Sequence, residues 1–145
     1  MITVLLVDDH AVLLDGLRFL LEAQGDMQII GMAGNGQEAV DLAVLACPDI
    51  ILMDISMPVM NGIEATKHIC KICKNTKVAI LSMHHTTEYM QRALEAGAVG
   101  YLLKDSAGTE LVTAIRALHS GKRYLSRQVA KSLGDNSMWG NQNGL

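Results

Sequence analysis

The 145-residue sequence predicts an α/β fold, an open and doubly wound parallel sheet of five strands with helices on both faces. Two observations predict this class. Five short apolar runs alternate with five longer helical patterns, an order that requires crossover connections between parallel strands. Most of the short runs are continuously apolar rather than alternating, which is typical of strands buried on both faces.

The apolar runs are rich in aliphatic and β-branched residues, and polar or turn-forming residues bound each of them. Half of the chain is hydrophobic and only 3% is aromatic, so we expect a core of aliphatic side chains. The predicted strands are Ile2–Val7, Met27–Ala33, Asp49–Met53, Lys77–Leu81 and Val99–Leu103.

Capping signals delimit the helices. Asn35 with Glu38 and Asn61 with Glu64 have the spacing of capping boxes, and Ser106 is a predicted N-cap. Glycines lie where three of the helices are expected to end, because glycine adopts the left-handed conformation easily. These glycines are Gly25, Gly97 and Gly121. The predicted helices are Val12–Gln24, Gln37–Ala46, Gly62–Cys73, Thr87–Ala96 and Thr109–Ser120.

Composition and charge argue against several classes of protein. The formal net charge of −3 disfavours a general nucleic-acid-binding surface, which is normally basic. No apolar stretch reaches the roughly 20 residues needed to span a bilayer, and the N-terminus has no features of a signal peptide. The three cysteines predict reduced thiols and a cytoplasmic location. A metal or redox role for Cys70-x-x-Cys73 is disfavoured, because both residues lie in one predicted helix and Cys47 is distant in sequence.

Polar side chains follow four of the predicted strands at their carboxyl ends. Asp8 and Asp9 follow the first strand, Asp54 the third, Ser82 the fourth and Lys104 the fifth. Ligands of open α/β sheets bind at this edge, where the strand order reverses. Two carboxylates about 4 Å apart repel each other by roughly 4 kcal/mol at an effective dielectric of about 20. Three clustered acids therefore require a cation or a proton.

The residue types at this edge indicate phosphoryl chemistry. An all-oxygen set of ligands favours a hard cation, and Mg²⁺ suits a shallow site with one or two carboxylates. Lys104 adds a positive charge and Ser82 a small hydroxyl donor. A carboxylate nucleophile beside a metal ion, a lysine and a hydroxyl is what formation of an aspartyl phosphate requires. The pattern therefore predicts a phosphoacceptor site centred on Asp54.

Four blocks of sequence, in order and at the ends of the matching strands, resemble the receiver domain of bacterial two-component response regulators. The blocks are Val-Asp8-Asp9-His, Met-Asp54-Ile-Ser-Met-Pro58-x-x-Asn-Gly62, Leu-Ser82-Met-His and Gly-Tyr101-Leu-Leu-Lys104-Asp. The resemblance runs from Ile2 to about Leu118 and implies a flavodoxin-like (CheY-like) (βα)5 fold. The sequence around Tyr101 and the stretch Ser-Gly-Lys-Arg-Tyr124-Leu-Ser are similar to sequences of the LuxR/FixJ-type subfamily. Receivers of that subfamily precede a helix-turn-helix domain.

The resemblance implies a role for each matching acid. Asp54 would accept a phosphoryl group from the phosphohistidine of a sensor histidine kinase. Mg²⁺ would be held by Asp9, Asp54 and the backbone carbonyl of Ser56, with Asp8 acting through water. Beyond its own phosphorylation and dephosphorylation, the chain is not expected to be an enzyme.

A switch is implied as well. Ser82 and Lys104 would hold the phosphoryl oxygens, and Ser82 with Tyr101 matches the switch pair of the family. The hydroxyl would move toward the phosphoryl group, the ring would turn inward, and the face formed by the fourth helix, fifth strand and fifth helix would repack. That face would control an output, namely transcription, and a phosphorylation-dependent homodimer is one expected partner state.

Two positions depart from the usual receiver pattern. Ser82 stands where many receivers have threonine, but the hydroxyl is kept. Asp105 stands where many have proline, although Asp is common there in the LuxR-type subgroup. The nearby His84 and His85 are interpreted either as exposed loop residues or as residues that tune dephosphorylation.

Residues 1–121 are predicted to form the receiver domain and residues 122–145 a polar linker or tail, so DNA would be contacted only through an output domain outside this sequence. No membrane partner is expected. Two alternatives stay open. One is a stand-alone receiver without DNA-binding output. The other is a metal-dependent phosphohydrolase with an Asp nucleophile, although such enzymes usually carry an Asp-x-Asp pattern after the first strand and a cap. A degenerate receiver that only docks is disfavoured by the intact acids, hydroxyl and lysine.

Overall fold

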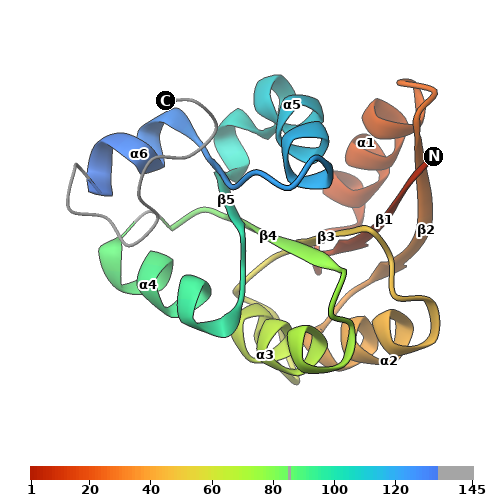
Figure 1. The fold of residues 1–145 in the computed structure, drawn as a ribbon, viewed down its shortest axis with the longest axis horizontal. Coiled ribbons are helices and arrows are strands. Elements are labelled where there is room, and N and C mark those ends of the chain that lie inside the picture. The colour runs from red at the N-terminus through yellow and green to blue at the C-terminus, as the bar shows by residue number, and fades with distance from the viewer. Residues whose placement is uncertain (85, 134–145) are drawn as a thin grey trace.

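One sheet runs through the middle of the protein, and the computed structural model describes residues 1–84 and 86–133 of the chain (Figure 1). The strands are β1 (Ile2–Val7), β2 (Met27–Ala33), β3 (Ile50–Met53), β4 (Lys77–Ser82), β5 (Gly100–Leu103) and β6 (Tyr124–Leu125). Their order across the sheet is β2-β1-β3-β4-β5-β6, and all neighbouring strands are parallel. The five predicted strands are confirmed, each to within one residue at either end.

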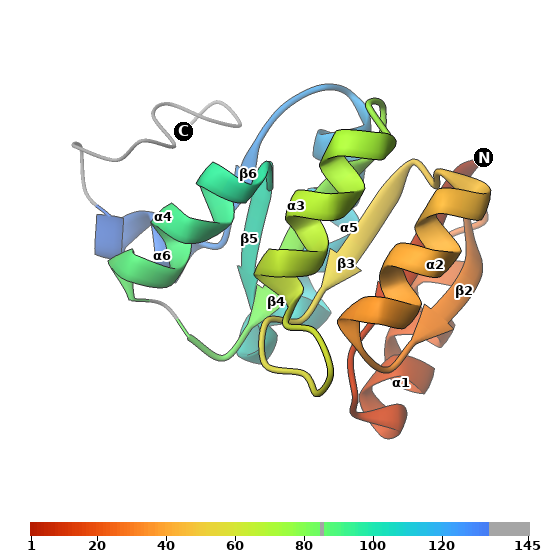
Figure 2. The same ribbon diagram turned by 90° about the horizontal axis from the view of Figure 1, so that it is seen from below.

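Helices cover both faces of the sheet, as predicted. They are α1 (Ala11–Glu22), α2 (Gly36–Ala46), α3 (Gly62–Ile72), α4 (Thr87–Ala96), α5 (Ala107–His119) and α6 (Arg127–Leu133). Figure 1 shows α1 and α5 on one face and α2, α3 and α4 on the other, and Figure 2 shows the row of α2, α3 and α4 from below. A 3-10 turn at Lys104–Ser106 leads from β5 into α5.

Two apolar layers, one on each face of the sheet, make up the core. The layer beneath α1 and α5 includes Leu21 and Leu118, and the layer beneath α2, α3 and α4 includes Ile69 and Met90. The core is aliphatic, as the composition predicts, with one large exception. Tyr101 of β5 is aromatic and fully buried.

The start and stop signals of the helices are largely confirmed. The side chains of Asn35 and Asn61 each accept a hydrogen bond of 2.9 Å from the backbone N–H three residues later. Ser106 occupies the N-cap position of α5, but its hydroxyl makes no capping bond and instead donates to the carbonyl oxygen of Leu103. The three predicted end glycines all have positive φ angles, namely 83° at Gly25, 112° at Gly97 and 95° at Gly121.

The expected number of strands is wrong by one, because the segment from residue 122 continues the sheet. Tyr124 donates a backbone hydrogen bond to Val99, and Ser126 donates one to Tyr101, which pairs β6 with β5. Leu125 and Val129 are buried in the layer that contains Tyr101. β6 has only two residues, which is too short for a recognisable strand pattern in the sequence. The polar residues around it instead favour the interpretation as a linker.

The expectation of three reduced thiols is also wrong for two of the cysteines. Cys47 ends α2 and Cys73 ends α3, and the two residues form a disulfide with their Cα atoms 5.5 Å apart. Only Cys70 is free among the described residues. The two cysteines are far apart in sequence, so the sequence does not suggest that they pair. They meet in the structure because α2 and α3 are neighbouring helices whose final residues lie at one end of the sheet.

Among the described residues, no helix combines the length and apolarity needed to cross a bilayer. The expected linker or tail over residues 122–145 is described up to residue 133, where it forms β6 and α6. Trp139 in that tail and His85 in the loop before α4 lie outside the described residues.

Candidate functional site

The site lies where the order of the strands reverses, between β1 and β3. Val7 pairs with Met53 at the ends of these strands, so the acids that follow them, Asp8 and Asp54, emerge side by side. The backbone N–H of Asp54 donates a 2.9 Å hydrogen bond to the carbonyl oxygen of Val7, which fixes the end of β3 against β1. The structure therefore places these predicted acids together at the carboxyl edge of the sheet.

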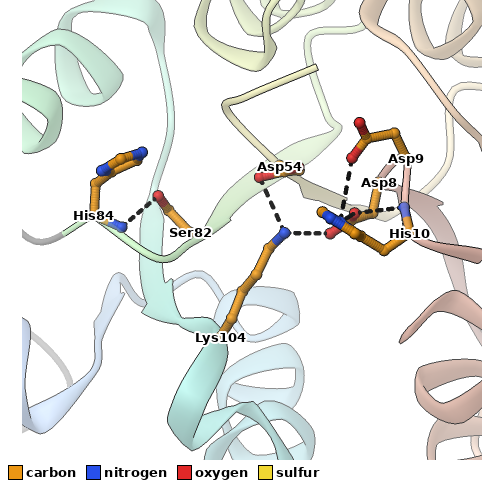
Figure 3. Close-up of polar contacts among 7 residues, drawn as sticks. All are labelled: Asp8, Asp9, His10, Asp54, Ser82, His84 and Lys104. Carbon is orange, nitrogen blue, oxygen red and sulfur yellow. Dashed lines mark hydrogen bonds and ion pairs between the residues drawn. The ribbon is translucent and has the colours of Figure 1, made fainter. Parts of the chain in front are cut away.

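Lys104 comes from the end of β5 and lies between the two buried acids (Figure 3). Its Nζ atom is 2.7 Å from Oδ2 of Asp8 and 3.3 Å from Oδ1 of Asp54. Its side chain is only 10% exposed. One ammonium group thus balances two buried carboxylates, so the cluster keeps an excess of negative charge.

Burial and neighbouring charges act in opposite directions on this cluster. Burial raises the pKa of Asp54 above its ordinary value, and the charge of Asp8 raises it further. Burial also opposes ionisation of Asp8, but hydrogen bonds from Lys104 and His10 outweigh it and lower the pKa of Asp8. Burial would lower the pKa of Lys104, yet the two carboxylates raise it. Asp8 and Lys104 therefore form the closer ion pair, and of the two buried acids Asp54 has the less compensated charge.

His10 also belongs to the cluster, a position for which the sequence alone predicts no role. Its Nδ1 atom lies 2.6 Å from Oδ1 of Asp8 and 3.2 Å from Oδ1 of Asp9, and its backbone N–H donates to the same Asp8 oxygen. The Asp8 carboxylate raises the pKa of the imidazole. The available signal was its place directly after the acid pair, at the N-cap position of α1.

The donor set fits a small divalent cation. One ligand atom from each of Asp8, Asp9, His10 and Asp54 can be chosen so that all lie within 4.8 Å of one another. Oδ2 of Asp54 is buried and has no hydrogen-bond partner among the described residues, whereas Oδ2 of Asp8 lies beside the Lys104 ammonium. His10 in this set already contacts Asp8 through its Nδ1 atom, and the remaining donors are carboxylate oxygens, which hard cations prefer. Ser56 lies in the exposed loop two residues after Asp54.

Gly62, the first residue of α3, packs closely against the backbone of Asp54. A Cβ atom at this position would overlap the backbone carbonyl oxygen of Asp54. The N–H of Gly62 donates a 3.0 Å hydrogen bond to the carbonyl oxygen of Ile55, and Asn61 caps the same helix. The Asn-Gly pair thus brings the start of α3 directly against the backbone of Asp54.

The predicted switch residues meet at the main chain of His84. Ser82 is buried at the end of β4, and its Oγ accepts a 2.9 Å hydrogen bond from the N–H of His84 (Figure 3). The hydroxyl of Tyr101 donates a 2.7 Å hydrogen bond to the carbonyl oxygen of His84. Burial raises the pKa of Tyr101 to about 12, against a smaller opposite effect of Ser82. The imidazole of His84 is exposed and stacks on Tyr89 of α4, with ring centroids 4.7 Å apart.

Comparison with known proteins decides the family. The response regulator receiver domain family matches residues 4–116. The chain belongs to that family. It is 46% identical over 130 residues to the transcriptional regulatory protein LiaR of Bacillus subtilis, a match that covers 90% of this chain and 62% of LiaR.

Two further likenesses support the LuxR/FixJ-type subfamily of receiver domains. The response regulator UvrY of Escherichia coli is 38% identical over 133 residues, which cover 92% of this chain and 61% of UvrY. The crystal structure of a LuxR-family two-component response regulator from Aurantimonas sp. matches with a TM-score of 0.85 at 37% identity, covering 90% of this chain and 93% of that one. The chain spans less than two thirds of LiaR and of UvrY. Membership of the receiver family favours the signalling interpretation over the phosphohydrolase alternative.

Replacement of Lys104 by Met in this receiver domain is expected to destabilise the metal-free fold by about 3 kcal/mol, because Asp8 and Asp54 both lose the buried ammonium group that they share. Excess Mg²⁺ should restore much of the loss, since a divalent cation supplies the missing positive charge. Urea denaturation in chelator and in Mg²⁺ measures both effects. Lys67→Met on the exposed face of α3 is the matched control, and equal losses in the two variants would contradict the role given to Lys104.

Proposed function

We propose that this receiver domain is the phosphoacceptor module of a two-component response regulator and that Asp54 is the acceptor. One observation carries the proposal. The Asp54 carboxylate has one oxygen beside the Lys104 ammonium and one buried oxygen without a hydrogen-bond partner among the described residues. A carboxylate whose charge is incompletely neutralised is available as a nucleophile.

The transfer itself requires little more than positioning. An oxygen of Asp54 attacks the phosphorus atom of a phosphohistidine on a sensor histidine kinase, and the phosphorus–nitrogen bond breaks as the phosphorus–oxygen bond forms. The kinase imidazole leaves with the electron pair and takes up a proton. Lys104 pairs with a phosphoryl oxygen, and the hydroxyl of Ser82 donates to another. Both groups stabilise charge that spreads over the equatorial oxygens during transfer.

The same cluster is the proposed Mg²⁺ site. Asp8, Asp9 and Asp54 would hold the ion with the backbone carbonyl of Ser56, and the bound ion would neutralise negative charge on the transferred group. His10 holds Asp8 through Nδ1 and a backbone N–H, so we assign it the task of orienting that carboxylate. Residues that orient metal-binding carboxylates in this way influence affinity without binding the ion.

The proposed switch passes through His84. When the hydroxyl of Ser82 turns toward a phosphoryl oxygen, the N–H of His84 loses its acceptor and the loop before α4 shifts. The carbonyl oxygen of His84 then moves relative to the Tyr101 hydroxyl that it binds. A change at Asp54 would in this way alter the face formed by α4, β5 and α5, as a shift in population between two arrangements.

The wider setting is part of the proposal. The receiver would span residues 1–121, and the segment from residue 122, with β6 and α6, would connect it to a DNA-binding output that controls transcription. A sensor histidine kinase and a phosphorylation-dependent homodimer are the proposed protein partners. We place the protein in the cytoplasm, because a histidine kinase requires ATP to form its phosphohistidine.

Acetyl phosphate tests the acceptor directly. With Mg²⁺, intact-protein mass spectrometry should show the addition of one phosphoryl group, and fragmentation should map it to Asp54. Chelation of Mg²⁺ should suppress the reaction. Turnover of p-nitrophenyl phosphate in large excess over the protein would instead support a phosphohydrolase, and a phosphoryl group mapped to any other residue would contradict the assignment.

A further inference from the structure

The disulfide lies at the opposite edge of the sheet from the phosphoacceptor site. Cys47 follows the last turn of α2 and Cys73 the last turn of α3. At the other end, Gly36 of α2 donates a backbone hydrogen bond to Met60 in the loop that carries Ser56, and α3 begins directly after that loop. The Cα separation of 5.5 Å lies within the range that unstrained disulfides require. The bond joins residues 26 positions apart, and this stretch includes all of β3 and Asp54.

The fold is compatible with both the reduced and the oxidised form of the Cys47–Cys73 pair. Cys47 is an exposed residue and Cys73 is a buried one, so we expect a reagent in solution to reach Cys47 first. Sγ of Cys73 lies 3.3 Å from the carbonyl oxygen of Ala43. A thiol would donate a hydrogen bond to that oxygen, whereas a disulfide sulfur, which carries no hydrogen, would leave the oxygen to the N–H of Cys47. Reduction therefore leaves no buried polar atom unpaired.

Cys47 has a backbone conformation that usually favours glycine, which indicates that the cysteine side chain itself is needed at this position. Its φ angle of 38° lies in the left-handed region, where helix ends usually carry glycine. A cysteine there is held in a conformation that costs free energy, and such outliers cluster at functional positions. Gly25, Gly97 and Gly121 follow the usual rule at other helix ends of this chain.

We propose that Cys47 and Cys73 form a redox-active pair, a site of oxidation by low-molecular-weight disulfides, which clamps the ends of α2 and α3 when bonded. The thiolate of Cys47 attacks a disulfide RSSR, giving a mixed disulfide and one RS⁻. The thiolate of Cys73 then attacks Sγ of Cys47 and releases the second RS⁻. Overall, two protein thiols and one RSSR become one protein disulfide and two RSH. The inference takes only its cytoplasmic setting from the proposed function, since disulfides there are usually transient or redox-sensing.

Cys70 is the internal reference for this chemistry. It lies on α3 three residues before Cys73, and its Sγ is 3.7 Å from the carbonyl oxygen of Gly97. Burial raises the pKa of its thiol, which keeps it protonated and unreactive. The thiol of Cys70 is therefore expected to stay free under both reducing and oxidising conditions.

The test is a thiol count across mixtures of reduced and oxidised glutathione, using acid quenching, alkylation in denaturant and mass spectrometry. Three alkylated thiols are expected under reducing conditions and one under oxidising conditions, with peptide mapping linking residues 47 and 73. The oxidised form should melt on the order of 10 °C higher, because the closed loop restricts the unfolded chain. Three free thiols at every ratio, a lasting mixed disulfide on Cys47, a Cys70–Cys73 link or unchanged melting would each overturn the proposal.

Three variants keep the result interpretable. Cys47→Gly removes the thiol and the left-handed strain together, so it should fold at least as stably as the reduced wild type and lose all redox response. Cys70→Ser should keep the full shift in melting temperature. Asp54→Asn should show the same thiol titration as wild type, so a failure of the redox pair and a failure of the phosphoacceptor are read separately.

Discussion

Asp54→Asn is expected to abolish phosphorylation and at the same time to raise the stability of the metal-free protein. The first effect follows because a neutral amide cannot act as the nucleophile toward phosphorus. The second follows from the site's excess of charge. The variant removes one of two buried carboxylates that share Lys104 and leaves the closer Asp8–Lys104 pair intact. We expect a rise in melting temperature on the order of 4 °C, which corresponds to roughly 1 kcal/mol for a domain of this size.

The stability gain of Asp54→Asn over wild type is expected to disappear as the pH falls. The pKa of Asp54 is raised in the folded state by burial and by Asp8, so the folded protein binds the proton more tightly than the unfolded chain. Ionised Asp54 therefore destabilises the fold at neutral pH. As the pH falls through the raised pKa toward the ordinary value of 3.8, the carboxyl takes up a proton and the gap between wild type and Asp54→Asn should close.

Two measurements separate charge relief from a general effect of the substitution. Thermal melts in chelator should rank the variant above wild type, and Mg²⁺ should stabilise wild type more than the variant. Asp15→Asn on the exposed face of α1 is the matched control and should change neither phosphorylation nor melting temperature appreciably. A variant that still accepts phosphate at full rate would show that Asp54 is not the acceptor.

Gly62→Ala is expected to cost about 3 kcal/mol of stability, although it adds a single methyl group. That methyl would overlap the carbonyl oxygen of Asp54, and a backbone atom cannot turn aside as a side chain can. The start of α3 and the end of β3 must therefore separate. The loss corresponds to a fall in melting temperature of roughly 10 °C. In the folded fraction, displacement of Asp54 should slow phosphorylation on the order of 100-fold.

Gly16→Ala is the matched control for this clash. Gly16 lies inside α1, and a Cβ atom there would have no neighbour within 4 Å. The same substitution should therefore stabilise the protein by up to about 1 kcal/mol, because alanine is the better helix former. Melting curves and initial rates with acetyl phosphate measure both variants. Similar stability changes at the two glycines would show that close approach to Asp54 is not what requires Gly62.

Strands, and the residues that parallel strands bring to one edge of the sheet, could be predicted from sequence, whereas contacts that depend on where helices end could not. The continuous apolar runs located β1 to β5, because a strand buried on both faces leaves a clear signature. The grouping of Asp8, Asp54 and Lys104 was also predictable, since parallel strands bring their carboxyl ends to one edge. The Cys47–Cys73 pair had no such signature. It depends on how far α2 and α3 extend and on a left-handed residue at the end of one of them.

Local chemistry explains the remaining differences. His10 directly follows Asp9, but only the turn into α1 shows that its Nδ1 returns to Asp8. The side chain of Ser106 bonds back to Leu103 instead of capping α5, which the 3-10 turn before the helix permits. The family resemblance paired Ser82 with Tyr101, but their connection through the main chain of His84 is a property of the folded structure.

The short strand β6 has a consequence for how copies of the protein can associate. The carbonyl oxygen of Tyr101 and the N–H of Leu103 are both bound to Ser126, so the outer edge of β5 is already occupied by the chain itself. An open strand edge invites pairing with other molecules, and a two-residue strand offers too little length to continue the ladder. Any homodimer formed on this side would have to be held by side chains on helices. Such a contact can be released when a helix shifts, whereas a shared sheet cannot.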